Sequence, residues 1–248
     1  MENKNVFATT LFAILLGISL VSSAFIVSNT IYDVKNLNNT LEVTGSTRYK
    51  VRSDTVEWKA NVTRTVKMSD LKNGYTQIAN DINNVIAFYK SNGIQDTEIK
   101  TYPVSVNQDW SYTKTSDQKP EDQMYILSQV IEVDSSSVDA ISNLSKDASK
   151  LASINALYST QSVEYYYSGL PELRINLLSD AIKDAKLRAQ KIAESNNQTV
   201  GSLRSASMGS VLVLAPNANV EDGSWGSYDT STIDKEVMVT VRASFLIK

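Results

Sequence analysis

Cysteine and histidine are both missing from the 248 residues of this chain, and their absence removes several kinds of site at once. Without thiols there is no disulfide framework and no cysteine nucleophile, and without either residue no common zinc site can form. A serine-histidine triad is excluded for the same reason. A chain without cysteine is also compatible with an envelope compartment in which redox conditions change. The available chemistry therefore rests on carboxylates, amines, hydroxyls and aromatic rings, and no metal ligands, catalytic residues or cofactor site are predicted.

An excess of positive charge is missing as well. The formal net charge is −3, the isoelectric point is near 5.2, and the lysines are scattered along the chain. Proteins that bind nucleic acid concentrate lysine and arginine on one face. We therefore expect no nucleic-acid partner.

Charge is absent altogether from Val6 to Val27, a run of 22 uncharged positions. A helix of that length measures about 33 Å, enough to cross the hydrocarbon core of a bilayer. Residues 1–28 are therefore predicted to be a membrane anchor or a signal sequence. The small residues Ser22-Ser23-Ala24 suit cleavage by signal peptidase. The apolar run continues beyond them, and this favours an uncleaved anchor.

The charges that flank the run give a weak indication of orientation, with Lys4 on one side and Lys35 and Arg48 on the other. We expect the large part of the chain to be extracytoplasmic, in the periplasm or at the cell surface. Residues 29–40 are polar and are predicted to connect the anchor to the folded part.

Proline and glycine are scarce, at four and nine residues, and no linker rich in them divides residues 41–248. This length can bury a substantial core. We interpret it as one continuous domain with a long internal excursion.

The spacing of apolar residues predicts the strands and helices of residues 41–167. Apolar residues alternate from Thr55, which indicates a strand with one covered face, and spacings of three and four indicate a helix from an N-cap at Ser69 to Asn92-Gly93. The expected elements are strands at 41–46, 55–62, 94–106, 124–133 and 156–167, helices at 69–92 and 135–153, and a polar loop or hairpin tip at 108–123. The order of strands and helices is that of a split βαβ arrangement, with two helices on one face of an antiparallel sheet.

A third helix is predicted from Leu170-Pro171, because proline suits the first turn. Its apolar stripe includes alanines four residues apart, at positions 181, 185, 189 and 193, which would let the helix approach its partner closely. Strands at 200–206 and 211–215, a polar loop at 216–233 and an alternating strand at 237–247 are expected to follow. The predicted fold class is α+β, an antiparallel sheet with helices on one face, preceded by one transmembrane helix.

Four stretches resemble a known family, the SIMPL domain (DUF541) family, which includes the bacterial 26 kDa periplasmic immunogenic protein and oxidative-stress-defence proteins. They are Leu41–Ser46 with Ser53–Val56, Gly93–Tyr102, Asp180–Ala193 with Val200–Leu203, and Val237–Phe245. The chain departs from the family pattern at Ser46-Thr47 and Ser53, where a second glycine and a proline are usual. The resemblance implies an α+β envelope protein that can form higher oligomers, in at least one member of the family a ring or channel-like assembly, with no catalytic set to carry over.

Candidate sites can be weighed from residue types alone. The acids Asp54, Glu57, Glu98, Glu132 and Glu164 lie on or beside predicted strands, but solvated strand faces commonly carry such residues. Their pairing into a catalytic site is the minority hypothesis. Calcium binding by the loop acids 117, 121 and 122, or by 221 and 222, is a similarly weak hypothesis, because their spacing matches no defined calcium loop. A solvated loop is the preferred interpretation.

Aromatic residues form a second candidate. Tyr165, Tyr166 and Tyr167 alternate along a predicted strand, so at least one face presents phenol rings whose hydroxyls need partners. The other members of this group are Tyr102, Trp110, Tyr112, Tyr158 and Trp225. Packing under the loops is the preferred interpretation, and subunit contact is the alternative.

The sequence thus favours a membrane-anchored, non-enzymatic and self-associating envelope protein, with a link to envelope or oxidative-stress tolerance implied by the resemblance alone. Two alternatives stay open. One is a hydrolase or transferase that uses carboxylates, and the other is a module that binds a small apolar or cell-wall ligand between sheet and helices.

Overall fold

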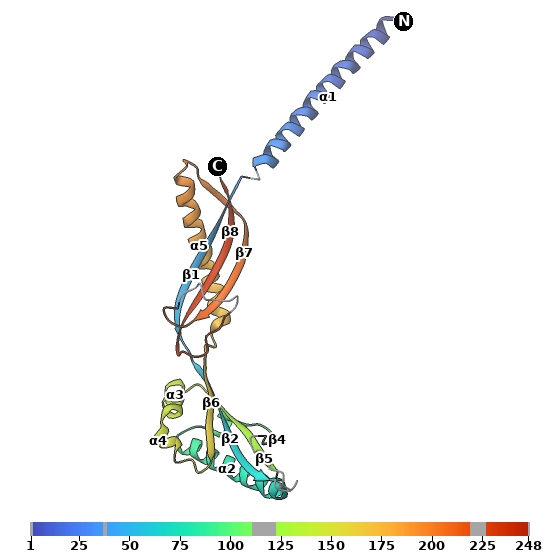
Figure 1. Cartoon of the computed structure of the whole chain (residues 1–248). Coiled ribbons are helices and arrows are strands. Elements are labelled where there is room, and N and C mark those ends of the chain that lie inside the picture. The colour runs from blue at the N-terminus through green and yellow to red at the C-terminus, as the bar shows by residue number, and fades with distance from the viewer. Residues whose placement is uncertain (1, 37–38, 111–122, 219–226, 248) are drawn as a thin grey trace. The chain divides into compact units, whose positions relative to one another are not determined.

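The computed structural model describes residues 2–36, 39–110, 123–218 and 227–247 (Figure 1). Contacts divide the chain into two compact units, each built from segments that are distant in sequence. Unit 1 comprises residues 1–47, 176–210 and 239–248, and unit 2 comprises residues 48–175 and 211–238. The division into anchor, connector and one folded domain stays a prediction.

The first helix, α1 (Glu2–Asn36), contains the predicted apolar run and continues into the polar segment predicted as a connector. The segment Ile14–Ile31 of this helix has a mean hydropathy of 1.9, and none of its residues is buried against the rest of the chain. By length and composition, α1 can cross a membrane. An N-terminal signal sequence would meet the same criteria.

Unit 2 contains a five-stranded sheet in the order β3-β5-β2-β6, with β4 also paired to β5. Its strands are β2 (Thr55–Lys67), β3 (Ile99–Thr101), β4 (Ser105–Gln108), β5 (Met124–Ser135) and β6 (Leu157–Tyr166). The paired neighbours are antiparallel, as the predicted split βαβ arrangement requires. The extended segment predicted at 94–106 is divided into a short 3-10 turn, β3 and β4, and Pro103 lies between these two edge strands.

The core of unit 2 lies between this sheet and its helices. Val56, Trp58, Ala60 and Val62 are all 0% exposed, so the alternation along β2 predicted the buried face correctly. Trp58 packs against Tyr89 of helix α2 (Leu71–Ser91), with their ring centroids 5.0 Å apart. Large apolar side chains therefore fill the space between the sheet and α2.

Helix α2 packs on β2 and β5. The prediction of Ser69 as N-cap is wrong, because residues Met68–Asp70 form a 3-10 turn and Asp70 precedes the first turn of α2. The predicted end of this helix at Asn92-Gly93 is confirmed. Gly93 has a φ of 91°, a left-handed conformation that glycine adopts without strain. Asp81 on α2 is 3% exposed and accepts two hydrogen bonds from Arg64.

The helix predicted at 135–153 is two short helices, α3 (Val138–Lys146) and α4 (Ala148–Leu151). Asp147 separates them with a φ of −81° and a ψ of 87°, and its carboxylate accepts a hydrogen bond from the amide of Lys150. A side chain that caps a new helix competes with continuation of the first, which explains the break. Helix α3 packs on β2 and β6.

Unit 1 contains residues from a three-stranded sheet in the order β1-β8-β7. The strands are β1 (Thr40–Arg52), β7 (Val200–Leu214) and β8 (Asp234–Ile247), and the associated helix is α5 (Leu170–Glu194). The alternation predicted at the C-terminus is confirmed, because Val239, Val241, Ala243 and Phe245 are at most 2% exposed. The two strands predicted at 200–206 and 211–215 are one continuous strand, β7.

Close packing of α5 on β1 explains the spaced alanines. Ala181, Ala185 and Ala189 are 0% exposed, and a Cβ added at Gly45 would lie 2.1 Å from the carbonyl oxygen of Ala181. Only a residue without a side chain fits there. Asp184 of α5 also accepts a hydrogen bond of 2.8 Å from the amide of Ser46. The glycine and the alanines therefore permit the same close approach of helix and strand.

Substitution of Gly45 by alanine should destabilise unit 1, because the added methyl group would overlap the backbone of α5. We expect a loss of about 1–3 kcal/mol in the free energy of unfolding, measured by urea denaturation. The control is Thr44→Val on the same strand, where the side chain is exposed and the change should stay within about 0.5 kcal/mol. Equal stability of the Gly45→Ala and Thr44→Val variants would contradict this packing.

Candidate functional site

The face of the five-stranded sheet opposite the core carries most of its charged side chains. In the antiparallel register, Glu57 of β2 lies between Asp134 of β5 and Glu164 of β6. Two residues along β2, Lys59 lies opposite Glu132 of β5. Residues directly opposite in antiparallel strands share a face and lie within reach of each other. We call this surface the charged sheet face, made of Glu57, Lys59, Lys100, Tyr102, Glu132, Asp134, Glu164 and Tyr166.

Glu132 is the most buried member of the charged sheet face, at 4% exposure. It accepts hydrogen bonds of 2.7 Å from the Tyr102 hydroxyl and 3.2 Å from the Lys100 ammonium, and the Lys59 ammonium lies 3.6 Å away. Burial would raise the pKa of the Glu132 carboxyl, but the hydrogen bonds and both cations outweigh it and hold this pKa below its ordinary value. Glu132 is therefore a paired carboxylate.

The two lysines are held as cations by their acidic neighbours. The hydrogen bond from Lys59 to Glu57 raises the pKa of Lys59 against its partial desolvation. Hydrogen bonds to Glu132 and Asp134, the latter 3.3 Å long, raise the pKa of Lys100. Both amines are thus stabilised in the protonated state.

The tyrosines of this face are held neutral. The hydrogen bond from the Tyr166 hydroxyl to Glu164 raises the pKa of Tyr166 to about 12, and that from Tyr102 to Glu132 raises the pKa of Tyr102. The ring of Tyr166 packs against Tyr228, with centroids 5.9 Å apart. A loop therefore covers this tyrosine, as the preferred interpretation of the aromatic run expected.

These shifts bear on what the charged sheet face can do chemically. General acid-base catalysis works best with a pKa near the operating pH. Here the pKa of Glu132 moves down, while those of Lys59, Lys100, Tyr102 and Tyr166 move up, all away from neutrality. The arrangement suits a fixed pattern of charges for binding or packing better than it suits proton transfer.

The structure gathers three of the five acids singled out from the sequence, Glu57, Glu132 and Glu164, on this face. The other two lie elsewhere. Asp54 accepts hydrogen bonds from the amide and hydroxyl of Ser168, and Glu98 accepts one from the hydroxyl of Ser135. Sequence reasoning missed Lys59, Lys100 and Asp134, although the charges that alternate with apolar residues on β2 and β5 could have revealed them once the strands were aligned.

A second polar cluster surrounds Lys235, whose side chain is 0% exposed. Its ammonium donates to the carbonyl oxygens of Asp229 and Thr232, the latter at 2.7 Å, and lies 5.6 Å from the centre of the Tyr228 ring. Burial lowers the pKa of Lys235, opposed by the Asp229 carboxylate at 3.8 Å. The lysine holds residues 228–232 together from inside, a role that its sequence position did not suggest.

One family model matches the chain over residues 41–245, that of SIMPL, described as a protein of unknown function (DUF541). The chain belongs to the SIMPL family. The match includes the charged sheet face, the Lys235 cluster and the contact between β1 and α5. A search of curated proteins gives no match.

The remaining aromatic residues of this SIMPL domain have mixed environments. Tyr165 is 3% exposed and donates a hydrogen bond of 2.8 Å to Ser142, and the hydroxyls of Tyr158 and Tyr89 lie 2.8 Å apart. Packing is therefore the role of Tyr158 and Tyr165. Trp110 is 77% exposed. Tyr112, Trp225 and the candidate calcium-binding acids 117, 121, 122, 221 and 222 lie outside the described residues.

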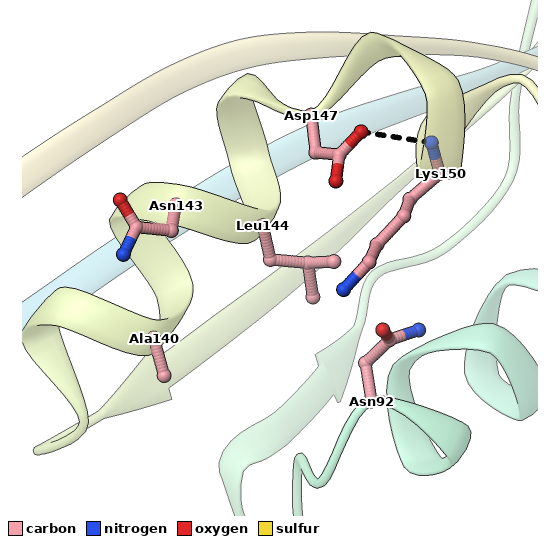
Figure 2. Close-up of a pocket in the computed structure, with 6 residues that line it drawn as sticks. All are labelled: Asn92, Ala140, Asn143, Leu144, Asp147 and Lys150. Atoms are coloured by element: carbon pink, nitrogen blue, oxygen red, sulfur yellow. Dashed lines mark hydrogen bonds between the residues drawn. The ribbon is translucent and has the colours of Figure 1, made fainter.

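Two hollows lie on the helical side of unit 2. One, of about 260 Å³, is lined by Asn92 of the α2 C-cap and by residues of α3 and α4, including Leu144 and Lys150 (Figure 2). The other, of about 420 Å³, lies between α2 and residues 153–155. Both are open to solvent, and the larger one is mostly polar, unlike the enclosed apolar pockets typical of small-molecule sites. Within the described ranges, no group of three or more acidic residues is placed to hold a metal ion.

Neutralising Glu132 should weaken the SIMPL domain and flatten its acid dependence. Because its pKa is lowered on folding, the stability from ionised Glu132 is fully present above its unfolded pKa of about 4.5 and is lost as pH falls through the lower folded pKa. We expect Glu132→Gln to cost about 1–2 kcal/mol at pH 7 and to lose less stability than the parent on acidification. Urea unfolding between pH 7 and pH 3 measures both, with the exposed Glu172→Gln as control. Identical pH profiles in the parent and Glu132→Gln would refute this assignment.

Removing the Lys235 ammonium should loosen the loop around it. Lys235→Met keeps the length of the side chain but leaves the buried acceptors of Asp229 and Thr232 unpaired, so we expect a loss of about 3 kcal/mol. Chemical denaturation measures this loss, and limited proteolysis reports whether residues 227–233 become accessible. Lys72→Met, at an exposed position of unit 2, should change neither. A Lys235→Met variant as stable and as protease-resistant as the parent would contradict the role of the lysine.

Proposed function

We propose that this SIMPL protein is tethered to the membrane by α1, exposes its folded part on the extracytoplasmic side, and works by self-association and contacts rather than by catalysis. The observation that carries the proposal is the wholly exposed apolar window of α1. In water, such a helix would expose a large apolar surface, and insertion into a bilayer removes that cost.

The charged sheet face supports a role in contacts. It presents acids and amines on one face of a sheet, and the pKa shifts hold Glu132, Lys59 and Lys100 in the charge states they already have at neutral pH. Fixed charge patterns of this kind confer specificity and orientation on an encounter with a partner. A carboxylate-dependent hydrolase would instead need one acid raised toward neutrality as proton donor.

The membrane tether favours self-association. Molecules confined to a membrane meet at a higher effective concentration than free molecules do, so weak interfaces become populated. The resemblance stated above also implies oligomers, in the periplasm or at the surface of the cell envelope.

A link to envelope or oxidative-stress tolerance remains part of the proposal on the strength of the resemblance alone. Direct scavenging of oxidants is the less favoured route, because the chain has no cysteine and only five methionines. A role in stress would then act through assembly at the envelope.

Crosslinking in intact cells, followed by membrane fractionation and mass determination, tests location, processing and association together. The expected product is a chain of 27.4 kDa that resists alkaline extraction, is digested by protease added outside the cytoplasmic membrane, and forms crosslinked multiples. Recovery of the full-length chain in the cytosol would overturn the proposal, and a membrane-free, shortened chain would overturn the tether.

A matched pair of variants separates anchoring from the properties of the folded part. Leu16→Arg combined with Ile18→Arg places two charges in the apolar window, at about 2.5–3.5 kcal/mol each, and should release the chain from the membrane. Leu16→Ala with Ile18→Ala shortens the same side chains without charge and should leave it anchored. Equal retention of both variants would contradict insertion of α1.

A further inference from the structure

Strand β7 has an unusual environment for a strand within a sheet. Residues 202–209 are all exposed, although successive side chains point to opposite faces. Neither face of the strand is therefore covered by the described part of the chain along this stretch. Further along, Leu212, Val213 and Leu214 are buried, so the exposure is local to one segment.

The outer edge of this segment is also open within the described ranges. β7 is the terminal strand of the order β1-β8-β7, and its only further pairing among the described residues is the bridge between Val213 and Tyr228. Residues 200–210 read Val-Gly-Ser-Leu-Arg-Ser-Ala-Ser-Met-Gly-Ser, with one charge, Arg204, and no proline. Edge strands usually carry charges, prolines or bulges that prevent pairing with another chain. This one carries little such protection.

The opposite edge strand of the same sheet, β1, is in contact with α5. The amide of Ser46 on β1 is bound by Asp184, Arg188 contacts the same carboxylate at 2.8 Å, and α5 packs directly over Gly45. Glu42 on β1 carries a charge paired with Arg242. Pairing at the edge of β1 would have to break the hydrogen bond between the Ser46 amide and Asp184, whereas a β7 to β7 arrangement leaves this bond intact.

We infer that the 202–210 segment of β7 pairs antiparallel with the same segment of a second copy of this chain. This inference rests on the proposed self-association and names the surface that mediates it. A two-fold axis perpendicular to the sheet keeps each side chain on its own face, so one residue must lie directly opposite its own copy, with the axis midway between the two. The register that uses the whole segment centres on Ala206.

The side chains suit that register. Arg204 lies opposite Met208 of the second copy, so the only charge in the segment does not face its own equivalent. Ser205 lies opposite Ser207, and Leu203 lies opposite Gly209. Like charges directly opposite would destabilise the pair, and small residues let the two backbones and faces approach without overlap. The exposed segment is thus self-complementary.

The absence of cysteine makes the register directly testable in the full-length chain in membranes. Ala206→Cys places two thiols opposite each other at the axis, within disulfide distance, and mild oxidation should give a covalent dimer. Ser202→Cys alone should not, because its two copies would lie about 26 Å apart. Ser202→Cys combined with Ser210→Cys should restore the dimer.

A second variant tests the energetics of the contact. Ala206→Lys places two ammonium groups opposite each other and should reduce crosslinked multiples at least tenfold, whereas Thr44→Lys on the exposed face of the other edge strand should leave them unchanged. Circular dichroism and the unfolding midpoint check that both variants fold. If Ala206→Lys does not fold, the cysteine pairs decide the question.

The outcomes separate this inference from the proposal beneath it. Crosslinked multiples without a disulfide dimer from Ala206→Cys, or multiples that survive Ala206→Lys, would overturn the β7 contact and leave self-association intact. A chain that stays monomeric in every membrane assay would overturn both. Dimers from Ala206→Cys and from the double variant at 202 and 210, with none from Ser202→Cys alone, are the result expected.

Discussion

The antiparallel pairing of β2 with β5 on one side and β6 on the other is the constraint on which unit 2 depends. Because side chains alternate along a strand, this register sends Val56, Trp58, Ala60 and Val62 into the core and Glu57 and Lys59 to the opposite face. A slip of one residue would exchange the two faces and bury the charges. Burial of Trp58 against Tyr89 opposes that slip. The same choice of register therefore determines both the core and the charged sheet face.

The electrostatics around Glu132 follow from the opposite charges of its neighbours on the two adjacent strands. Lys100, Glu132 and Lys59 lie side by side on β3, β5 and β2, so the buried carboxylate has a cation on each side. The desolvation of Glu132 is offset by these partners and by the Tyr102 hydroxyl. The cost of burying the Lys235 ammonium is offset by different partners, which are two backbone carbonyl oxygens and one carboxylate. In both places the hydrogen bonds and charges of its partners satisfy the buried polar group.

The three-stranded sheet of unit 1 depends on a steric condition. Gly45 and the small residues of α5 bring helix and strand together so closely that Asp184 reaches a backbone amide of the edge strand. This leaves β1 protected and β7 uncovered. The asymmetry between the two edges, rather than any apolar patch, is what directs the inferred contact to β7.

Local pattern in the sequence determined the uncharged run within the N-terminal helix, the buried faces of β2 and β8, the α5 alanine stripe and the stop at Gly93, because each depends on neighbours a few positions away. The succession of these elements along the chain then indicated the split βαβ arrangement. The break at Asp147, the 3-10 turn before α2 and the continuity of β7 depend on competition between local hydrogen bonds and packing, which periodicity does not report. The charged sheet face and the Lys235 cluster were decided by tertiary structure alone. Glu57, Glu132 and Glu164 are far apart in the chain, and only strand pairing sets which of them share a face and which cation lies beside each.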